Sequence, residues 1–194
     1  MKIREAVAAD LEDVLAVERA AFGEDEEAEL TRALLDDPSA QPAVSLLAFE
    51  NERAVGHVLF TAARLVTSGS QTTEVSEDSE NPGRLETVSV ALLAPLAVVP
   101  TMQKKGIGTS LIESGFDRLK STGVNLVFVL GSPEYYPRCG FRPAGTLGFE
   151  APYVLPEKWT DAWMVRALTP DLIGTISGKV VCADAISKPE YWQE

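Results

Sequence analysis

The amino-acid sequence predicts an α/β fold in which a mixed, mostly antiparallel sheet is flanked by helices. Two strand patterns, Val44–Glu50 and Ala54–Thr67, are separated only by a short polar turn, which is typical of an antiparallel hairpin. The segment Asn125–Leu130 is apolar almost throughout, as expected of a parallel strand that is covered on both faces. Amphipathic helix patterns precede the hairpin and separate the later strands, so helices are expected to cover the sheet.

The chain begins with the pattern of one short strand and two helices. The alternating segment Lys2–Ala6 predicts a first edge strand. Asp10 precedes apolar residues spaced by three and four, so we expect it to be the N-cap of an amphipathic helix. A second helix is expected over Glu26–Leu35, where leucines recur on one face and Pro38 follows. The acidic run Glu24–Glu29 lies at its start, where carboxylates suit the helix dipole, and we interpret it as a solvated face rather than a partner-binding patch.

The composition changes after the hairpin. Ser68–Arg84 is rich in Ser, Thr, Glu, Asp, Asn, Pro and Gly, which indicates an exposed acidic loop. Leu85–Val99 then predicts a long strand with Pro95 at an edge or a bend. A loop over Pro100–Lys105 and a helix over Gly106–Lys120 follow it.

The last third of the chain has shorter elements. After the buried strand, Pro133–Cys139 predicts a short helix and Phe141 a return to strand. Trp163–Leu168 predicts a further strand.

Composition excludes several classes of protein. The 194 residues contain 17 Lys and Arg against 29 Asp and Glu, a formal charge of −12, which argues against a protein that coats nucleic acid and against a polybasic membrane anchor. Two cysteines and one histidine are too few for a disulfide scaffold, a four-thiolate zinc site or a His-rich metal centre, so no metal is expected. No secretory signal and no apolar span of membrane length is seen, and we expect a cytoplasmic protein without membrane attachment.

The segment Leu96–Ile112 contains the most informative motif. An apolar strand runs into a loop with one Gln, two Lys and two Gly, and this loop begins an amphipathic helix. Glycines let the backbone approach an anion, successive N–H groups point at it, and the helix N-terminus adds favourable potential. Lys104 and Lys105 supply positive charge, so the pattern predicts a ligand that carries a phosphate or pyrophosphate. Gly106-x-Gly108 alone is a weak signal, because two glycines that cap a helix explain it about equally well.

Two nucleotide-binding motifs fit this segment poorly. No Gly-Lys-Ser/Thr follows the glycines, which excludes a Walker loop. Leu111 stands where a dinucleotide fingerprint requires Gly or Ala.

Gln103–Gly108 resembles the acetyl-CoA pyrophosphate loop, Gln/Arg-x-x-Gly-x-Gly/Ala, of the GCN5-related N-acetyltransferases (GNAT superfamily). The order of the expected helices and strands is also similar to theirs. The segment Gly131–Ala144, which includes Tyr136 and Gly140-Phe141, resembles their Tyr-x-x-x-Gly-Phe signature and is similar to that of small bacterial predicted acetyltransferases. The resemblance covers residues 1–168, which we expect to form the N-acetyltransferase domain. Residues 169–194 are expected to be a C-terminal extension packed on the same domain.

The resemblance implies a fold of the acyl-CoA N-acyltransferase type and transfer of the acetyl group of acetyl-CoA to an amine by direct attack. It implies that pantetheine pairs with the backbone of Leu96, Ala97 and Val98, that the Val98 N–H polarises the thioester carbonyl, and that Tyr136 protonates the leaving sulfur. It places the pyrophosphate on N–H groups of the glycine loop. The implied cofactor-binding residues are Leu96, Ala97, Val98, Gln103, Lys104, Lys105, Gly106, Ile107, Gly108, Thr109 and Tyr136. The sequence does not distinguish acetyl-CoA from other short-chain acyl-CoA donors.

For other chemically active side chains, a structural role is favoured over a catalytic one. Glu86 and Glu134 are candidates for the base that deprotonates the amine, although a solvated surface carboxylate is the more frequent reading. His57 lies in the middle of a strand and is interpreted as a satisfied core or rim histidine. Tyr135 is assigned to packing, and Cys139 to a small buried side chain without a nucleophilic role.

Two other classes of function remain as alternatives. One is a non-catalytic acyl-CoA-binding regulatory module, and the other is an interaction protein that works through its acidic surface. For an enzyme, the acceptor is expected to be a small-molecule or peptide amine. Cationic acceptors are favoured if the acidic loop Ser68–Arg84 lies near the acceptor entrance. Strands near the C-terminus are compatible with a homodimer.

Overall fold

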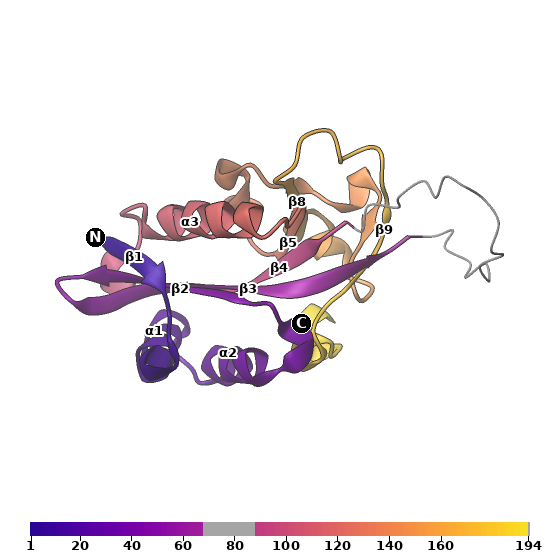
Figure 1. Ribbon diagram of the computed structural model, residues 1–194. Coiled ribbons are helices and arrows are strands. Elements are labelled where there is room, and N and C mark those ends of the chain that lie inside the picture. Colours follow the sequence, from indigo (N-terminus) through magenta and orange to yellow (C-terminus); the bar gives the residue numbers. More distant parts are fainter. Residues whose placement is uncertain (68–87, 194) are drawn as a thin grey trace, which may run out of the picture.

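The computed structural model describes residues 1–67 and 88–193, and its centre is a mixed sheet (Figure 1). Within the described residues the sheet has nine strands, of which seven follow the order β1-β2-β3-β4-β5-β8-β6. Neighbours on this path are antiparallel except β4 and β5, which are parallel. The strands are β1 (Lys2–Glu5), β2 (Val44–Glu50), β3 (Arg53–Val66), β4 (Val90–Val98), β5 (Leu126–Leu130), β6 (Arg142–Pro143), β7 (Phe149–Glu150), β8 (Trp163–Ala167) and β9 (Gly178–Val181). The predicted mixed, mostly antiparallel sheet is confirmed.

Helices cover both faces of this sheet. The α-helices are α1 (Leu11–Phe22), α2 (Glu26–Asp36), α3 (Ile107–Ser121) and the short α4 (Glu190–Gln193). Helix α3 lies on one face, and α1 and α2 lie on the other (Figure 1). Side chains alternate along a strand, so in β4 Ala91 and Leu93 pack toward α3 while Val90 and Leu92 pack in the core under α2.

The predicted first half of the fold is largely confirmed, with one correction at Asp10. The β2–β3 hairpin turns at Asn51 and Glu52, which both have positive φ. Asp10 precedes α1 as expected, but its carboxylate makes no capping bond to that helix. It accepts hydrogen bonds from the Val7 N–H (2.8 Å) and from the Arg4 guanidinium (2.6 and 2.8 Å) instead, which ties β1 to the start of α1.

Strand β4 is irregular where the sheet divides. Ala94 and Pro95 together oppose the single residue Leu59 of β3, so Pro95 lies in a β-bulge, as its position in the pattern indicates. Beyond the bulge β4 pairs with β3 alone, because its pairing with β5 covers only Val90–Leu92. The predicted loop Ser68–Arg84 and the first residues expected in this strand, 85–87, lie outside the described residues.

The C-terminal segment, residues 169–193, packs against two elements from the first half of the chain, β3 and α2. Strand β9 pairs with the end of β3 and with β7. The segment then crosses to the end of α2, where the Ala185 N–H donates to the Asp37 carboxylate (2.8 Å) and lowers the pKa of that group. Trp192 of α4 is 1% exposed and lies in the same core cluster as Leu34 of α2. Figure 1 shows this yellow segment beside α2.

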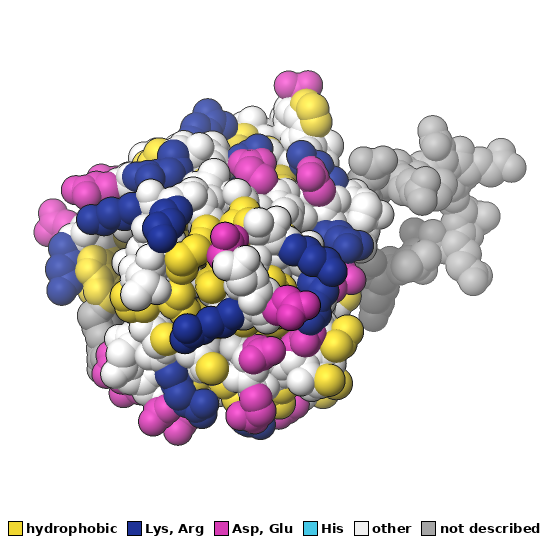
Figure 2. Space-filling model, turned by 90° about the vertical axis from the view of Figure 1, so that its left-hand side faces the viewer, with side chains coloured by type: hydrophobic (Ala, Val, Ile, Leu, Met, Phe, Trp, Pro, Cys, Tyr) yellow, Lys and Arg dark blue, Asp and Glu magenta, His cyan; other side chains and the backbone are white. Residues whose placement is uncertain are grey.

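The charges on the surface are mixed. On the face at the left of Figure 1, basic and acidic side chains are interspersed, so the net charge of −12 does not give this face a single sign (Figure 2). No helix in the described part of the chain is long and apolar enough to cross a membrane.

Candidate active site

A pocket of about 890 Å³ lies where β4 and β5 diverge. One side is formed by β4, the loop before α3 and the first turn of α3. Another is formed by the end of β5 and the 3-10 turn Tyr136–Cys139, and the far end by α1, α2 and the C-terminal segment. The pairing between the two central strands ends at Leu92, and the bulge in β4 follows directly, where Ala94 and Pro95 line this space.

The backbone of β4 presents alternate residues to this space. The Val99 N–H donates to the Val55 carbonyl of β3 (3.0 Å), and N–H directions alternate along a strand. The backbone groups of Leu96 and Val98 therefore face the gap left by β5, and both residues line the pocket. Ala97 is buried opposite His57, so its N–H and carbonyl face β3 and it lies outside the pocket wall.

The loop before α3 forms the predicted cradle. Gln103 Nε2 donates to the Val98 carbonyl (3.0 Å), which fixes the loop to the end of β4. Lys104 and Gly106 have positive φ of 61° and 82°, and this turns the chain into α3. The first N–H groups of a helix have no carbonyl partner inside it, so those of Ile107, Gly108 and Thr109 are available to a ligand at the pocket.

The two lysines of the motif differ in position. Lys104 lines the pocket, whereas the ammonium of Lys105 lies against the Met102 sulfur (3.4 Å) outside the pocket wall. Arg138 lines the pocket at the same end, stacked over the Tyr135 ring at 4.8 Å and with its Nε donating to the Tyr135 carbonyl (3.0 Å). Positive charge thus gathers at the end of the pocket beside α3.

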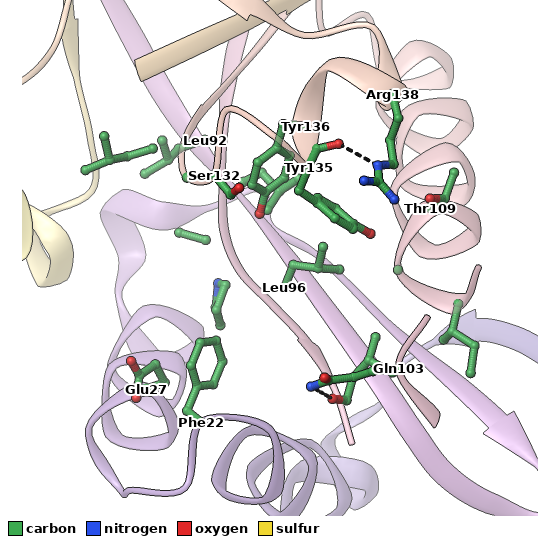
Figure 3. A pocket seen from close by; sticks show the side chains of 18 of the residues that line it. Phe22, Glu27, Leu92, Leu96, Gln103, Thr109, Ser132, Tyr135, Tyr136 and Arg138 are labelled. Carbon is green, nitrogen blue, oxygen red and sulfur yellow. Dashed lines mark hydrogen bonds between the residues drawn. The ribbon is translucent and has the colours of Figure 1, made fainter. Parts of the chain in front are cut away.

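Tyr135 packs against the core cluster, in agreement with the sequence-based assignment, and it also lines the pocket. Its side chain contacts Thr109 in the first turn of α3 (Figure 3), and its hydroxyl occupies the space that a Cβ at Gly108 would need. Gly108 is therefore required for the contact between α3 and Tyr135. The signature spacing pointed to Tyr136 only, and nothing in the sequence distinguished its neighbour.

Tyr136 lines the pocket next to Ser132, with its ring held edge-on between Tyr135 (5.2 Å) and Phe141 (5.6 Å). A Cβ at Gly131 would collide with this ring, so the turn after β5 is shaped to the tyrosine. Burial raises the pKa of the Tyr136 hydroxyl above its usual value of 10.0. The hydroxyl is consequently protonated at neutral pH and available as a proton donor.

The other candidate residues that the structure describes lie outside the pocket wall. His57 is fully buried, with Nδ1 at 2.5 Å from Glu18 Oε1 and Nε2 at 2.9 Å from Ser45 Oγ, so its interpretation as a satisfied core histidine is confirmed. Cys139 is 1% exposed and burial raises the pKa of its thiol, which agrees with a packing role. Glu134 is exposed and outside the pocket wall, and Glu86 lies outside the described residues. In the part of the chain that the structure describes, no three metal-ligating side chains gather.

In the described part of the chain, the central sheet divides and directs strand N–H groups into the pocket, next to the glycine loop that begins α3. This is the architecture of an acyl-CoA N-acyltransferase. The family model described as "Acetyltransferase (GNAT) family" matches residues 11–141. The chain belongs to the acetyltransferase (GNAT) family, the family that acetylates amines with acetyl-CoA.

Similar proteins extend over nearly the whole chain. The uncharacterized N-acetyltransferase YjhQ of Escherichia coli K12 is 42% identical over 176 residues, which are 90% of this chain and 88% of YjhQ. The crystal structure of YhbS from Escherichia coli in complex with CoA has a TM-score of 0.78 at 24% identity, covering 96% of this chain and 92% of that one. A GNAT family acetyltransferase from Brucella melitensis in complex with acetyl-CoA has a TM-score of 0.67 at 24% identity, covering 95% and 97%. These likenesses show the shared fold.

Proposed function

We infer that the chain binds acetyl-CoA in this pocket and transfers its acetyl group directly to an amine. The observation that carries the proposal is the arrangement along β4. Free N–H groups at Leu96 and Val98 lead straight to the cradle at the start of α3, with Tyr136 across the gap. That the solved structures similar in fold hold CoA and acetyl-CoA supports the same ligand here.

In this proposal the pyrophosphate is held by backbone N–H groups between Gln103 and Thr109, and Lys104 and Arg138 add positive charge. The pantetheine arm runs along β4 and pairs with the backbone of Leu96 and Val98. Ala97 supplies no pairing group in this arrangement, because its N–H and carbonyl face β3.

The chemistry follows from these positions. A neutral amine nitrogen attacks the thioester carbonyl carbon, and the negative charge that develops on the carbonyl oxygen is stabilised by the Val98 N–H. One oxyanion donor of this kind contributes about 10²–10³ in rate. The C–S bond then breaks and Tyr136 gives its proton to the sulfur, so that CoA leaves as the thiol. The amide nitrogen loses its extra proton to water, and Tyr136 regains a proton from water. The products are the N-acetylated amine and CoA.

Direct attack is favoured over an acyl-cysteine intermediate. The two cysteines are Cys139 and Cys182, and both are buried. Burial raises the pKa of the Cys182 thiol to about 12, so that neither sulfur is an exposed thiolate at neutral pH.

The proposal is tested by measuring thiol release from acetyl-CoA in the presence of a panel of primary amines. We expect release that depends on the amine. Tight binding of acetyl-CoA with no release for any amine would instead support the non-catalytic acyl-CoA-binding module. A parallel series with propionyl-CoA defines the acyl group that the pocket accepts.

A further inference from the structure

The two ends of the pocket differ in charge. Lys104 and Arg138 lie at the end beside α3, where the proposed function puts the phosphates. At the other end lies Glu27 of α2, the sole carboxylate among the described residues that line the pocket. Figure 3 shows Glu27 and Phe22 across the pocket from Arg138 and Thr109. The proposed placement of the cofactor leaves the end with Glu27 free for the acceptor.

Glu27 differs from the other acids at the start of α2. Glu26 and Glu29 are exposed, whereas Glu27 is half-buried and its Oε2 atom is buried with no hydrogen-bond partner in the described residues. The helix dipole favours an acid in this turn, but it does not explain a buried oxygen without a donor. A buried carboxylate oxygen normally has a donor, because its desolvation is otherwise costly. A ligand that brings an N–H donor would supply what is missing.

A second buried carboxyl group, that of Glu18, lies near Glu27 and is paired with His57 through its Oε1 atom. Glu18 of α1 is fully buried, and its Oε2 atom also lacks a partner in the described part of the chain. Burial is the main cause of the raised pKa of Glu18, and the nearby charge of Glu27 raises it further. The two side chains are thus close enough to interact. A positive charge placed beside Glu27 would offset the charge of this carboxylate next to a buried carboxyl group.

The walls around Glu27 are apolar and aromatic. Phe22 and Leu30 flank it on α1 and α2, and the C-terminal segment contributes Ile186, Tyr191 and Trp192 to the pocket. A charge pair is stronger beside such walls than in water, and aromatic faces attract cations. Among the described residues that line this end, Glu27, Tyr191 and Trp192 carry the polar side-chain groups.

We propose that Glu27 binds the ammonium group of the acceptor, and that the acceptor is a primary ammonium carried on an apolar or aromatic body. This inference rests on the proposed function, because it identifies the acceptor end of the same pocket. On binding, the ammonium donates hydrogen bonds to the Glu27 carboxylate, and the apolar body lies against Phe22, Leu30 and the C-terminal segment. The same nitrogen then loses one proton to water and attacks the thioester as the neutral amine. Glu27 is a binding and specificity residue, and the C-terminal segment is part of the acceptor site.

The test measures binding of 2-phenylethylamine to the CoA-loaded protein by calorimetry. 2-Phenylethanol serves as the uncharged probe of similar shape and spermidine as a cation without an aromatic body. The variant is Glu27→Gln, and the matched control is Glu29→Gln, which removes the same charge from an exposed position of the same helix. Loss of a hydrogen bond to a charged group predicts a dissociation constant for 2-phenylethylamine about 10- to 100-fold higher in Glu27→Gln. Glu29→Gln should leave the dissociation constant for 2-phenylethylamine unchanged, and neither variant should change the affinity for CoA. Glu27→Asp should bind 2-phenylethylamine more tightly than Glu27→Gln does.

Three results of the binding measurements would overturn the inference. In the first, the wild type and Glu27→Gln bind 2-phenylethylamine equally well. In the second, the wild type binds 2-phenylethanol as well as it binds 2-phenylethylamine. In the third, it binds spermidine in preference to 2-phenylethylamine. Thiol release with 2-phenylethylamine separates the two proposals. Glu27-dependent binding without release for any amine contradicts the proposed function, whereas release with the same KM in Glu27→Gln contradicts this inference alone.

Discussion

Tyr136 is suited to proton donation because the protein both buries and positions its hydroxyl. Its ring is wedged between Tyr135 and Phe141, and burial raises the pKa of the phenol. A phenol with a raised pKa holds its proton to a higher pH than tyrosine in water. The leaving thiolate therefore meets a protonated donor throughout the range in which the substrate amine becomes neutral.

We predict that Tyr136→Phe lowers kcat by about 10²-fold or more, the range of general acid catalysis, and leaves the affinity for acetyl-CoA unchanged. In the wild type, kcat should rise with pH as the amine loses its proton. No fall in kcat from loss of the phenolic proton should appear below about pH 10, the pKa of tyrosine in water, because the shift is upward. Steady-state kinetics from pH 6 to 10 measures this. An unchanged kcat in Tyr136→Phe would remove the tyrosine from the mechanism.

The contact between the start of α3 and the turn after β5 shapes the cofactor end of the pocket. Gly108 has no side chain where the Tyr135 hydroxyl lies, so one element fits against the other only with glycine at this position. The obstacle is the far end of a flexible side chain, so a small substitution should move Tyr135 rather than unfold the helix.

Gly108→Ala should therefore weaken binding of CoA, and Tyr135→Phe in the same chain should restore part of the loss by removing the hydroxyl. A double-mutant cycle on the dissociation constant of CoA is expected to give a coupling energy of about 0.5–3 kcal/mol, typical of residues in contact. Additive effects of the two substitutions would show that the contact does not matter for the cofactor.

The elements around the cofactor end could be predicted from the sequence because their signals are local. The spacing of Gln103, Gly106 and Gly108 indicates a cradle without knowledge of any distant residue. The direction of each N–H group along β4 could not be predicted, since it depends on register with β3 and on the bulge at Pro95. The sequence likewise places Glu27 on a solvated face, because its burial depends on segments that are distant in the sequence. Its helical spacing of four and seven to Thr31 and Leu34 was the available signal.

At the scale of the whole molecule, the acceptor end depends on chain segments that are far apart in sequence. Ile186 and Trp192 reach the pocket because the C-terminal segment pairs through β9 with β3 and then crosses to α2. The charge is divided in the same way, with Lys104 and Arg138 at one end and Glu27 at the other. The net charge of −12 conceals this polarity.

Trp192 connects stability and acceptor binding in this arrangement. It is 1% exposed, packs edge-on against Trp163 (5.8 Å), and donates through Nε1 to the Ile186 carbonyl (2.9 Å). We predict that Trp192→Ala lowers the free energy of unfolding by about 3–5 kcal/mol, as for other buried aromatics. It should also raise KM for the amine with little change in KM for acetyl-CoA.

Denaturant unfolding and steady-state kinetics check both parts of this prediction. Trp159→Ala is the matched control, since Trp159 is only half-buried and lies outside the pocket wall. An increase in KM for acetyl-CoA equal to that for the amine would show that the C-terminal segment does not serve the acceptor in particular.

The most direct test of the account follows acetyl transfer itself, by mass spectrometry of the amine together with thiol release from acetyl-CoA. With 2-phenylethylamine, we expect one N-acetylated amine for each CoA released by the wild type, and a rate about 10²-fold lower in Tyr136→Phe. Wild-type protein that binds acetyl-CoA but forms no acetylated product with this or any other primary amine would contradict it.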